Sequence, residues 1–293
     1  MLTALSTITA GTLELDGGAM FGVVPRTVWV RAYPPAGDHN RCVWAMRCLL
    51  AEFADGRKVI IDTGVGAKDG PQFRKHFNPQ GSSDLTRHLR QRPLHPEEIT
   101  DVLFTHLHFD HVGGASYVDA EGRTRLTFPN ATHWVCGAQW RWARRPNARE
   151  AASFLSANLD PLDRSGKLRL LPAQDSDYRW CDGVHLRTVY GHTEAMQLPL
   201  FDLPGGRRVV YCADLIPSAA HLSLPWVMAY DVRPLSTLAE KERLLHEAHA
   251  GDWTLLFEHD RTVAGGRLGH DERGRTVLVD ALDSFAFRRP SAG

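Results

Sequence analysis

The amino-acid sequence predicts an α/β fold in which β-sheets form the centre and helices lie outside. Two observations support this class. Short apolar runs typical of strands dominate the chain, and several are nearly continuous, as in strands buried on both faces. Helical segments lie between two strand-rich regions, and no segment rich in Pro, Gly and Ser is long enough to separate domains. We therefore expect one domain spanning residues 1–293.

The predicted strands are either continuously apolar or alternate between apolar and other residues. In the run VHLRTVY, for example, Val184, Leu186, Thr188 and Tyr190 share one face. In chain order the predicted strands cover residues 12–15, 48–53, 58–64, 99–106, 131–136, 184–192, 196–203, 207–214 and 253–259.

Helices are predicted between these runs, over residues 71–90, 138–160 and 238–249. The last is the clearest, because Thr237 followed by Glu240 fits a capping box. Its inward-facing stripe would consist of Leu238, Leu244, Leu245 and Ala248.

The composition is that of an ordinary globular protein, with 43% hydrophobic and 23% charged residues and a formal net charge of zero. This balance argues against a protein that binds polyanions through its overall charge. We see no signal peptide and no apolar run long enough to span a membrane. The five cysteines are scattered and form no CxxC, which favours reduced thiols in a cytoplasmic protein without a membrane partner.

Four metal-binding side chains are crowded into the stretch FTHLHFDHVGG, residues 104–114. They are His106, His108, Asp110 and His111. Alternation after a strand directs His106 and His108 to one side, whereas Asp110 and His111 lie on the turn that follows. Three imidazoles beside a carboxylate have few structural roles. The spacing suits two metals a few ångströms apart better than one.

Three further positions follow the same logic, because His192, Asp214 and His259 each stand at the far end of an apolar strand. Strand ends near one rim of a sheet can converge on one cleft. The carboxylate of Asp214 can bridge two divalent ions. Five histidines and two aspartates therefore supply enough ligands for two zinc-like centres with an open, water-bearing position.

With these motifs the sequence resembles the metallo-β-lactamase-fold hydrolase superfamily. The resemblance rests on THLHFDHVGG, on IDTG at 61–64, GHT at 191–193, AD at 213–214 and EHD at 258–260, all in the family's order. The segments LDGGAMFGVVP (15–25) and LPWVMAYD (224–231) look like a subgroup near the quorum-quenching lactonases.

The resemblance implies an αββα four-layer sandwich with a dinuclear metal site at one edge. One metal would be held by His106, His108 and His192, the other by Asp110, His111 and His259, with Asp214 bridging. Asp62 in IDTG would orient a ligand imidazole or the site loop, and its alternative role is a turn-capping carboxylate.

Such a site would hydrolyse its substrate with a hydroxide that bridges two divalent ions. Asp110 would bind one metal and then carry a proton to the leaving group. Zinc is the first expectation, and manganese, iron and cobalt also accept His/Asp sites. The favoured substrate is a small ester or lactone, and the alternative is a phosphodiester or phosphotriester.

The sequence says less about the substrate pocket. Lactonases of this superfamily place a Tyr three positions after the bridging Asp, where this chain has Pro217. Tyr230 or His221 would then substitute from the following loop. Met20 and Phe21 in GGAMFG would form an apolar lid over the metals, and the alternative is a packed N-terminal hairpin turn.

Other functions fit the sequence less well. Di-iron redox relatives carry a separate flavin domain, and this chain has no glycine-rich nucleotide fingerprint. A sensor that binds without turnover remains an alternative. The stretch QWRWARRPNAR (139–149) interleaves Arg with Trp, but a solvated helix face with Trp140 packed inward is favoured over nucleic-acid binding. We therefore expect a small-molecule substrate and no nucleic acid, and the Trp-rich segments allow a homodimer.

Overall fold

The computed structural model describes residues 1–37, 39–68, 70–81 and 85–290. The chain divides into two compact units. The first comprises residues 1–12, 46–173 and 286–293, and the second comprises residues 13–45 and 174–285. Each unit contains a seven-stranded sheet accompanied by helices, so the predicted α/β class is confirmed. The expectation of one domain stays a prediction.

The sheet of the first unit has the strand order β16-β1-β2-β3-β4-β7-β8. Neighbours among β3, β4, β7 and β8 are parallel, whereas β2 pairs with β3 and β1 with β16 in antiparallel fashion. The apolar run of β3 is continuous because Val59, Ile60 and Ile61 are all buried. The strands are β1 (Leu2–Asp16), β2 (Arg41–Phe53), β3 (Lys58–Ile61), β4 (Asp101–Leu103), β7 (Thr132–Cys136), β8 (Leu168–Leu171) and β16 (Ala286–Arg288).

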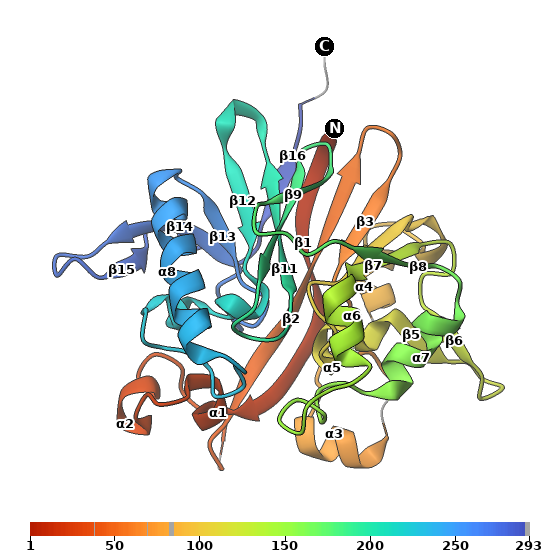
Figure 1. Cartoon of the computed structure of the whole chain (residues 1–293), viewed down its shortest axis with the longest axis horizontal. Coiled ribbons are helices and arrows are strands. Elements are labelled where there is room, and N and C mark those ends of the chain that lie inside the picture. Colours follow the sequence, from red (N-terminus) through yellow and green to blue (C-terminus); the bar gives the residue numbers. More distant parts are fainter. Residues whose placement is uncertain (38, 69, 82–84, 291–293) are drawn as a thin grey trace. The chain divides into compact units, whose positions relative to one another are not determined.

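Among the described residues of the first unit, five short helices and a small hairpin accompany the sheet. Helix α6 contacts β7 and β8 (Figure 1). The helices are α3 (Pro71–Phe77), α4 (Leu85–Arg90), α5 (Phe109–Val112), α6 (Gly137–Ala143) and α7 (Ser156–Arg164), and the hairpin pairs β5 (Ser116–Val118) with β6 (Thr124–Leu126). Single 3₁₀ turns are η1 (Pro96–Glu98) and η2 (Gly113–Ala115).

The sheet of the second unit has the strand order β15-β14-β13-β12-β11-β10-β9. Only β12 and β13 pair in parallel there; the other described neighbours are antiparallel. The strands are β9 (Tyr178–Cys181), β10 (Val184–Val189), β11 (Met196–Asp202), β12 (Arg208–Tyr211), β13 (Thr254–Leu256), β14 (Gly265–His270) and β15 (Thr276–Leu278).

Helix α8 is the longest helix of the second unit and contacts β14 (Figure 1). Its inward stripe includes Leu244, Leu245 and Ala248, as predicted. The helices are α1 (Gly17–Phe21), α2 (Arg26–Trp29) and α8 (Pro234–Ala250), and the 3₁₀ turns are η3 (Pro204–Gly206), η4 (Ala213–Leu215) and η5 (Ala219–Leu222).

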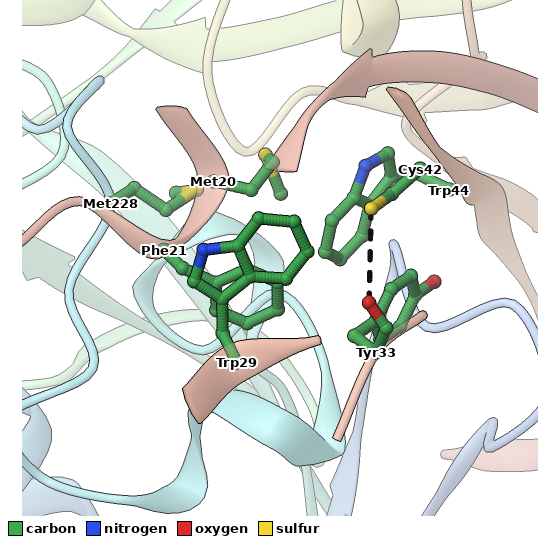
Figure 2. Packing of buried hydrophobic residues seen from close by; sticks show 7 residues of the cluster. All are labelled: Met20, Phe21, Trp29, Tyr33, Cys42, Trp44 and Met228. Carbon is green, nitrogen blue, oxygen red and sulfur yellow. Dashed lines mark hydrogen bonds between the residues drawn. The ribbon is translucent and has the colours of Figure 1, made fainter. Parts of the chain in front are cut away.

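A cluster of large side chains around α1 and α2 forms part of the core of the second unit (Figure 2). Phe21 stacks on Trp29 with ring centroids 5.1 Å apart, and Tyr33 stacks on Trp44 at 4.1 Å. A side chain at Gly17 would collide with the ring of Trp29, so only glycine fits at the start of α1. We call this set the aromatic cluster; it consists of Met20, Phe21, Trp29, Tyr33, Cys42, Trp44 and Met228.

Two helix predictions were wrong in extent. The predicted helix 71–90 is two helices, because α3 ends at Phe77 and its C-cap Asn78 has a left-handed φ of 42°. Residues 82–84 of the predicted helix lie outside the described residues. The predicted helix 138–160 is also divided, into α6 and α7. Pro146 follows the end of α6, and a proline cannot supply the N–H that a continuing helix needs.

The predicted capping box of the C-terminal helix was also wrong. Helix α8 begins at Pro234, three residues before Thr237, and its N-cap Arg233 makes no side-chain cap. A proline at the first helical position has its φ preset for a helix and needs no partner for a missing N–H. The carboxylate of Glu240 binds elsewhere, on the backbone before His192.

The nine predicted strands were confirmed, but several end earlier than predicted, and β8, β9, β14, β15, β16 and the β5–β6 hairpin were missed. Within the described part of the chain, no helix combines the length and apolar character needed to cross a membrane. All five cysteines are described, and none forms a disulfide.

Candidate metal centre

The histidine motif of the first unit lies directly after a buried strand. Strand β4 ends at Leu103, and the chain then turns through His106 and His108 into helix α5, which carries Asp110 and His111. The Nε2 atom of His106 lies 3.1 Å from Nδ1 of His108. Two nitrogens bound to one zinc at roughly 2.0–2.1 Å in a tetrahedral arrangement lie about 3.3 Å apart. The two imidazoles therefore face each other at the spacing that one shared cation requires.

The first turn of α5 adds a carboxylate and a third imidazole to this unit. Asp110 and His111 are both buried, and Oδ1 of Asp110 lies 3.9 Å from Nε2 of His111. The rings of His106 and His111 have centroids 3.9 Å apart. All four motif side chains thus gather within one unit.

The loop that follows β3 holds this motif in place. Asp62 adopts a left-handed φ of 57°, and its carboxylate accepts hydrogen bonds from the backbone N–H and the hydroxyl of Thr105, at 2.9 and 2.7 Å. Its Oδ2 also lies 3.1 Å from Nδ1 of His111. Thr63 binds the carbonyl oxygen of His111 through both its N–H and its hydroxyl, at 2.7 and 2.9 Å.

Two glycines allow the same loop to approach α5 closely. A Cβ at Gly113 would collide with the carbonyl oxygen of Val65, and one at Gly114 would collide with that of Thr63. The pair HVGG therefore permits backbone-to-backbone contact, and the amide of Gly114 uses it to donate to Gly64 at 2.8 Å.

The second unit brings together the three metal-type residues predicted at its strand ends. Asp214 lies on η4, just beyond β12. Its Oδ2 lies 3.1 Å from Nε2 of His192, and its Oδ1 lies 3.0 Å from Nε2 of His259. One carboxylate therefore presents a different oxygen to each of two imidazoles, which is the arrangement of a carboxylate that bridges two cations.

The five imidazoles share one pattern: one ring nitrogen faces another residue of the proposed ligand set and the second lies against a neighbouring polar group, although for Nε2 of His108 this is only a 3.5 Å ion-pair contact with Glu150. Metal-ligating histidines almost always have their second nitrogen held by a carboxylate, carbonyl or similar group, which fixes ring and tautomer. The contacts of the held nitrogens are His106 Nδ1 with Thr105 Oγ1 at 3.1 Å, His108 Nε2 with Glu150 Oε1 at 3.5 Å, His111 Nδ1 with Asp62 Oδ2 at 3.1 Å, His192 Nδ1 with Asp231 Oδ1 at 2.8 Å and His259 Nδ1 with the Ala45 carbonyl at 2.8 Å.

The electrostatics of the second unit favour a cation at His192. Burial on its own would lower the pKa of this imidazole. The carboxylates of Asp214 and Asp231 outweigh that effect and raise the pKa to about 10. A positive charge on or against Nε2, whether a proton or a metal ion, is therefore stabilised by two carboxylates.

Sequence reasoning missed several residues that surround the ligands. Asp231 and Glu150 contact ligand imidazoles but lie far along the chain from them, in segments without a local metal pattern. Glu258 is buried, and it offers a carboxylate oxygen within 4.8 Å of the ligand atoms of Asp214 and His259. The motif EHD could have drawn attention to Glu258. Asp231 ends the motif LPWVMAYD, but neither that motif nor the sequence around Glu150 indicated a contact with a histidine.

The four residues predicted for the substrate pocket differ in their burial and in their contacts. Met20 and Phe21 are buried in the aromatic cluster, on a short helix rather than a hairpin turn (Figure 2). Tyr230 is 39% exposed. Whether any of them contacts substrate stays a prediction.

His221 is held on both sides of its ring. Its Nε2 donates to the carbonyl of Met20 at 2.8 Å, and its Nδ1 accepts from the hydroxyl of Ser218 at 2.7 Å. The ring stacks on Phe21 with centroids 4.7 Å apart. Burial lowers the pKa of His221 to about 3, so it is neutral at physiological pH. These contacts bind both nitrogens within the protein.

The Arg- and Trp-rich stretch 139–149 is tied to the rest of the first unit. Trp140 is buried on α6, as predicted, and the guanidinium of Arg144 pairs with Asp160 at 2.6 Å. The indole N–H of Trp142 donates to Glu150 at 2.7 Å, the carboxylate that also faces His108. Trp142 therefore supports the carboxylate that contacts His108.

Comparison with known proteins agrees with this geometry. Residues 47–127 match the family described as the metallo-beta-lactamase superfamily. The chain is 26% identical over 284 residues to a protein of Mycobacterium tuberculosis named “Probable metallo-hydrolase”, with 83% of this chain and 84% of that protein covered. It is 25% identical over 222 residues to the N-acyl homoserine lactonase AttM of Rhizobium radiobacter, covering 70% and 78%.

Solved structures show the same fold. A crystal structure of a probable metal-dependent hydrolase from Staphylococcus aureus has a TM-score of 0.82 and 28% identity, covering 95% of this chain and 97% of that one. AidC, a dizinc quorum-quenching lactonase with product bound, has a TM-score of 0.74 and 18% identity, covering 95% of both chains.

The chain has the metallo-β-lactamase fold, and its residues 47–127 match that superfamily, as the motifs predicted. Its relatives and structural neighbours that are named metallo-hydrolases support a metal-dependent hydrolase, and lactonases are among the proteins it resembles.

Proposed function

We propose that this protein is a dinuclear metal-dependent hydrolase that acts on a small ester or lactone. The single observation that carries the proposal is the shared pattern of the five imidazoles, each with one nitrogen held and the other directed toward a fellow ligand. His221, a buried imidazole outside this set, instead binds protein groups through both of its nitrogens.

The ligands that we propose are His106, His108, Asp110, His111, His192, Asp214 and His259. A donor set of imidazoles and carboxylates fits zinc, and it also accepts manganese, iron or cobalt. A dizinc lactonase among the structural neighbours supports zinc as the first choice. When bound, two such ions would lower the pKa of a shared water enough to supply hydroxide near neutral pH.

Asp110 has two tasks in this proposal. Its carboxylate would help to hold one ion, and it would take up the proton lost by the attacking water and pass it to the oxygen of the leaving group. Its place on the first turn of α5 supports this, because the helix holds the carboxylate beside His111 while the loop around Asp62 holds the helix. Asp62 fixes the imidazole of His111 and takes no part in proton transfer.

An ester or lactone is favoured as substrate because AttM and AidC, named as lactonases, are similar to this chain. Pro217 stands where lactonases place a tyrosine, so substrate orientation must come from another group. His221 has both ring nitrogens bound within the protein, and Tyr230, which is 39% exposed, is the other candidate for this role.

The test is a matched panel of acyl-homoserine lactones, simple lactones, p-nitrophenyl esters, phosphodiesters and phosphotriesters, each with zinc-loaded and chelated protein. We expect lactone or ester turnover that chelation abolishes, with kcat/KM near 10⁴ M⁻¹s⁻¹ or above, roughly the low end for enzymes. Phosphoester rates well above lactone rates would assign the alternative substrate class. Absence of any chelator-sensitive turnover would contradict the proposal.

Measurement of bound zinc tests the proposed metal site independently of the identity of the substrate. We expect about two zinc ions per chain, and substantial loss of zinc in both His106→Ala and Asp214→Asn, which change one unit each. His246→Ala, an exposed histidine on α8, is the matched control and should keep both ions. Loss confined to one of the two variants would mean that the seven residues do not act as one ligand set.

Location and assembly also belong to the proposal. The absence of disulfides among the five cysteines supports a cytoplasmic location. The substrate is a small molecule, and light scattering would test the homodimer that the Trp-rich segments allow.

A further inference from the structure

Two adjacent residues of helix α8, Glu240 and Lys241, each bind backbone groups that lie outside the helix. Glu240 is half-buried and Lys241 is fully buried, although long charged side chains on a helix usually reach solvent. Glu240 binds the segment that leads into His192, and Lys241 binds the segment that leads toward Asp231. Their contacts therefore bear on a ligand that neither residue touches.

Glu240 binds the chain immediately before His192. Strand β10 makes its last pair with β11 at Val189, so the next two amide groups lie beyond the ladder. The carboxylate of Glu240 accepts from the N–H of Tyr190 at 2.7 Å and from that of Gly191 at 3.0 Å. A charged acceptor that takes two neighbouring amides fixes the direction in which the chain leaves the strand.

Gly191 allows α8 to approach this segment directly. A Cβ at Gly191 would collide with the backbone and hydroxyl of Thr237 in the first turns of α8. The segment before α8 adds two backbone hydrogen bonds, from Val232 to the His192 carbonyl at 3.2 Å and from Arg233 to the Gly191 carbonyl at 2.9 Å. The backbone of His192 is thus held by α8 and the residues that lead into it.

Lys241 binds the chain that leads to Asp231. Its ammonium donates to the carbonyl oxygens of Ser223 and Trp226, at 2.9 and 2.8 Å. Five residues after Trp226, Asp231 receives the Nδ1 hydrogen of His192. Burial lowers the pKa of Lys241 to about 7, and the charge of Asp231 acts in the opposite direction. The ammonium is therefore electrostatically coupled to Asp231 as well as bound to its segment.

We propose that Glu240 and Lys241 are positioning residues, which together set His192 against Asp231 and so direct Nε2 of His192 toward Asp214, where a metal ion would be held. The inference rests on the proposed function, because it takes His192 to be a metal ligand. It goes beyond that function because it assigns the orientation of His192 to helix α8, which contributes none of the proposed metal ligands.

The first measurement needs no metal. In metal-free protein with ¹⁵N-labelled histidine, the ring N–H of His192 that is bound to Asp231 gives a low-field proton resonance, which Asp231→Ala should abolish and thereby assign. We expect Glu240→Ala and Lys241→Met to broaden or shift this resonance. Glu242→Ala, an exposed glutamate on the same helix, should leave it unchanged. An unchanged resonance in folded Glu240→Ala and Lys241→Met would overturn the proposal.

The second measurement is zinc affinity, by competition with a chromophoric chelator, together with the melting temperature of the metal-free protein. We expect about tenfold or greater weakening in Glu240→Ala and Lys241→Met. Glu240→Gln, which keeps the shape and one acceptor, should restore part of the affinity and serves if Glu240→Ala does not fold. A lowered melting temperature with the zinc affinity of the Glu242→Ala control would overturn the proposal in favour of a purely structural role. If the unmodified protein binds no zinc, the proposed function fails, and the resonance of His192 still decides the positioning role.

Discussion

The Nδ1 atom of His192 lies 2.8 Å from Oδ1 of Asp231, a residue 39 positions further along the chain, and this contact leaves Nε2 facing Asp214. Asp231 therefore holds the Nδ1 hydrogen, so that Nε2 is the nitrogen directed at Asp214. We expect Asp231→Ala to weaken zinc binding about 10–100-fold, because loss of a carboxylate behind a ligand imidazole typically has this effect. Equilibrium competition with a chelator measures the change. The same zinc affinity in Asp231→Ala and in the unmodified protein would show that Asp231 does not orient His192.

Asp62 supports the other half of the ligand set. It is buried and accepts from Thr105 twice while contacting His111. Asn at this position would replace one carboxylate oxygen with an amide N–H, so that a donor of Thr105 would lose its acceptor. We therefore expect Asp62→Asn to lower the free energy of unfolding of the metal-free protein by about 2–3 kcal/mol. Urea denaturation measures it, with the exposed Asp55→Asn as control. A change no larger than that of the control would contradict the assigned contacts.

Gly114 is required by the close approach of its backbone to Thr63. We expect Gly114→Ala to cost about 2 kcal/mol or more in the free energy of unfolding, because the added methyl must displace a backbone carbonyl. It should also weaken zinc binding, since Thr63 holds the carbonyl of His111. Gly37→Ala, where a Cβ meets no neighbour within 4 Å, is the control for adding a methyl group. Equal stability of the two variants would refute the requirement.

The buried His133 should make the free energy of unfolding decrease in acid. Burial is the main cause that lowers its pKa from 6.5 to about 4, with Lys167 acting in the same direction and the carbonyl of Ala131 opposing. Between these two pH values the unfolded chain binds the proton and the folded chain does not, so stability falls as the pH decreases from about 6.5 toward 4. The loss at the lower end is about 3 kcal/mol, on the order of 1.4 kcal/mol for each pH unit.

His133→Leu removes the side chain that takes up this proton when the chain unfolds. We expect the free energy of unfolding of metal-free His133→Leu to fall less steeply than that of the unmodified protein over the same pH range. Urea titrations at several pH values give both slopes. Parallel slopes would mean that His133 is protonated in the folded state as readily as in the unfolded one.

The strands could be predicted from sequence because buried parallel strands require continuous apolar runs, as in β3. Their ends could not, because the residues that complete a run, such as His106 and Asp214, belong to the turns beyond it. Strand β14 was missed because its sequence GGRLGH has neither an apolar run nor alternation. The break after α3 depends on a left-handed Asn78, a conformation that asparagine permits without requiring.

The clustering of the metal-type side chains could be predicted because HxHxDH places four donors within reach of one another on the chain. Their supporting residues could not. Asp231 and Glu150 reach His192 and His108 only through tertiary folding, and a lone carboxylate in a loop has no distinguishing pattern. Glu240 was even assigned to a local cap, because sequence spacing cannot tell a cap from a long-range contact.

The contact between the loop at 62–66 and the glycine pair at 113–114 has a consequence for protein engineering. Neither segment keeps its conformation with an arbitrary partner, since carbonyl oxygens of the loop occupy the space where side chains would otherwise stand. If the histidine motif alone were transferred into another protein, its His and Asp side chains would lack the loop at 62–66 that fixes their backbone. The two segments form one transferable part, and homologous recombination within this family should succeed most often where both come from the same parent.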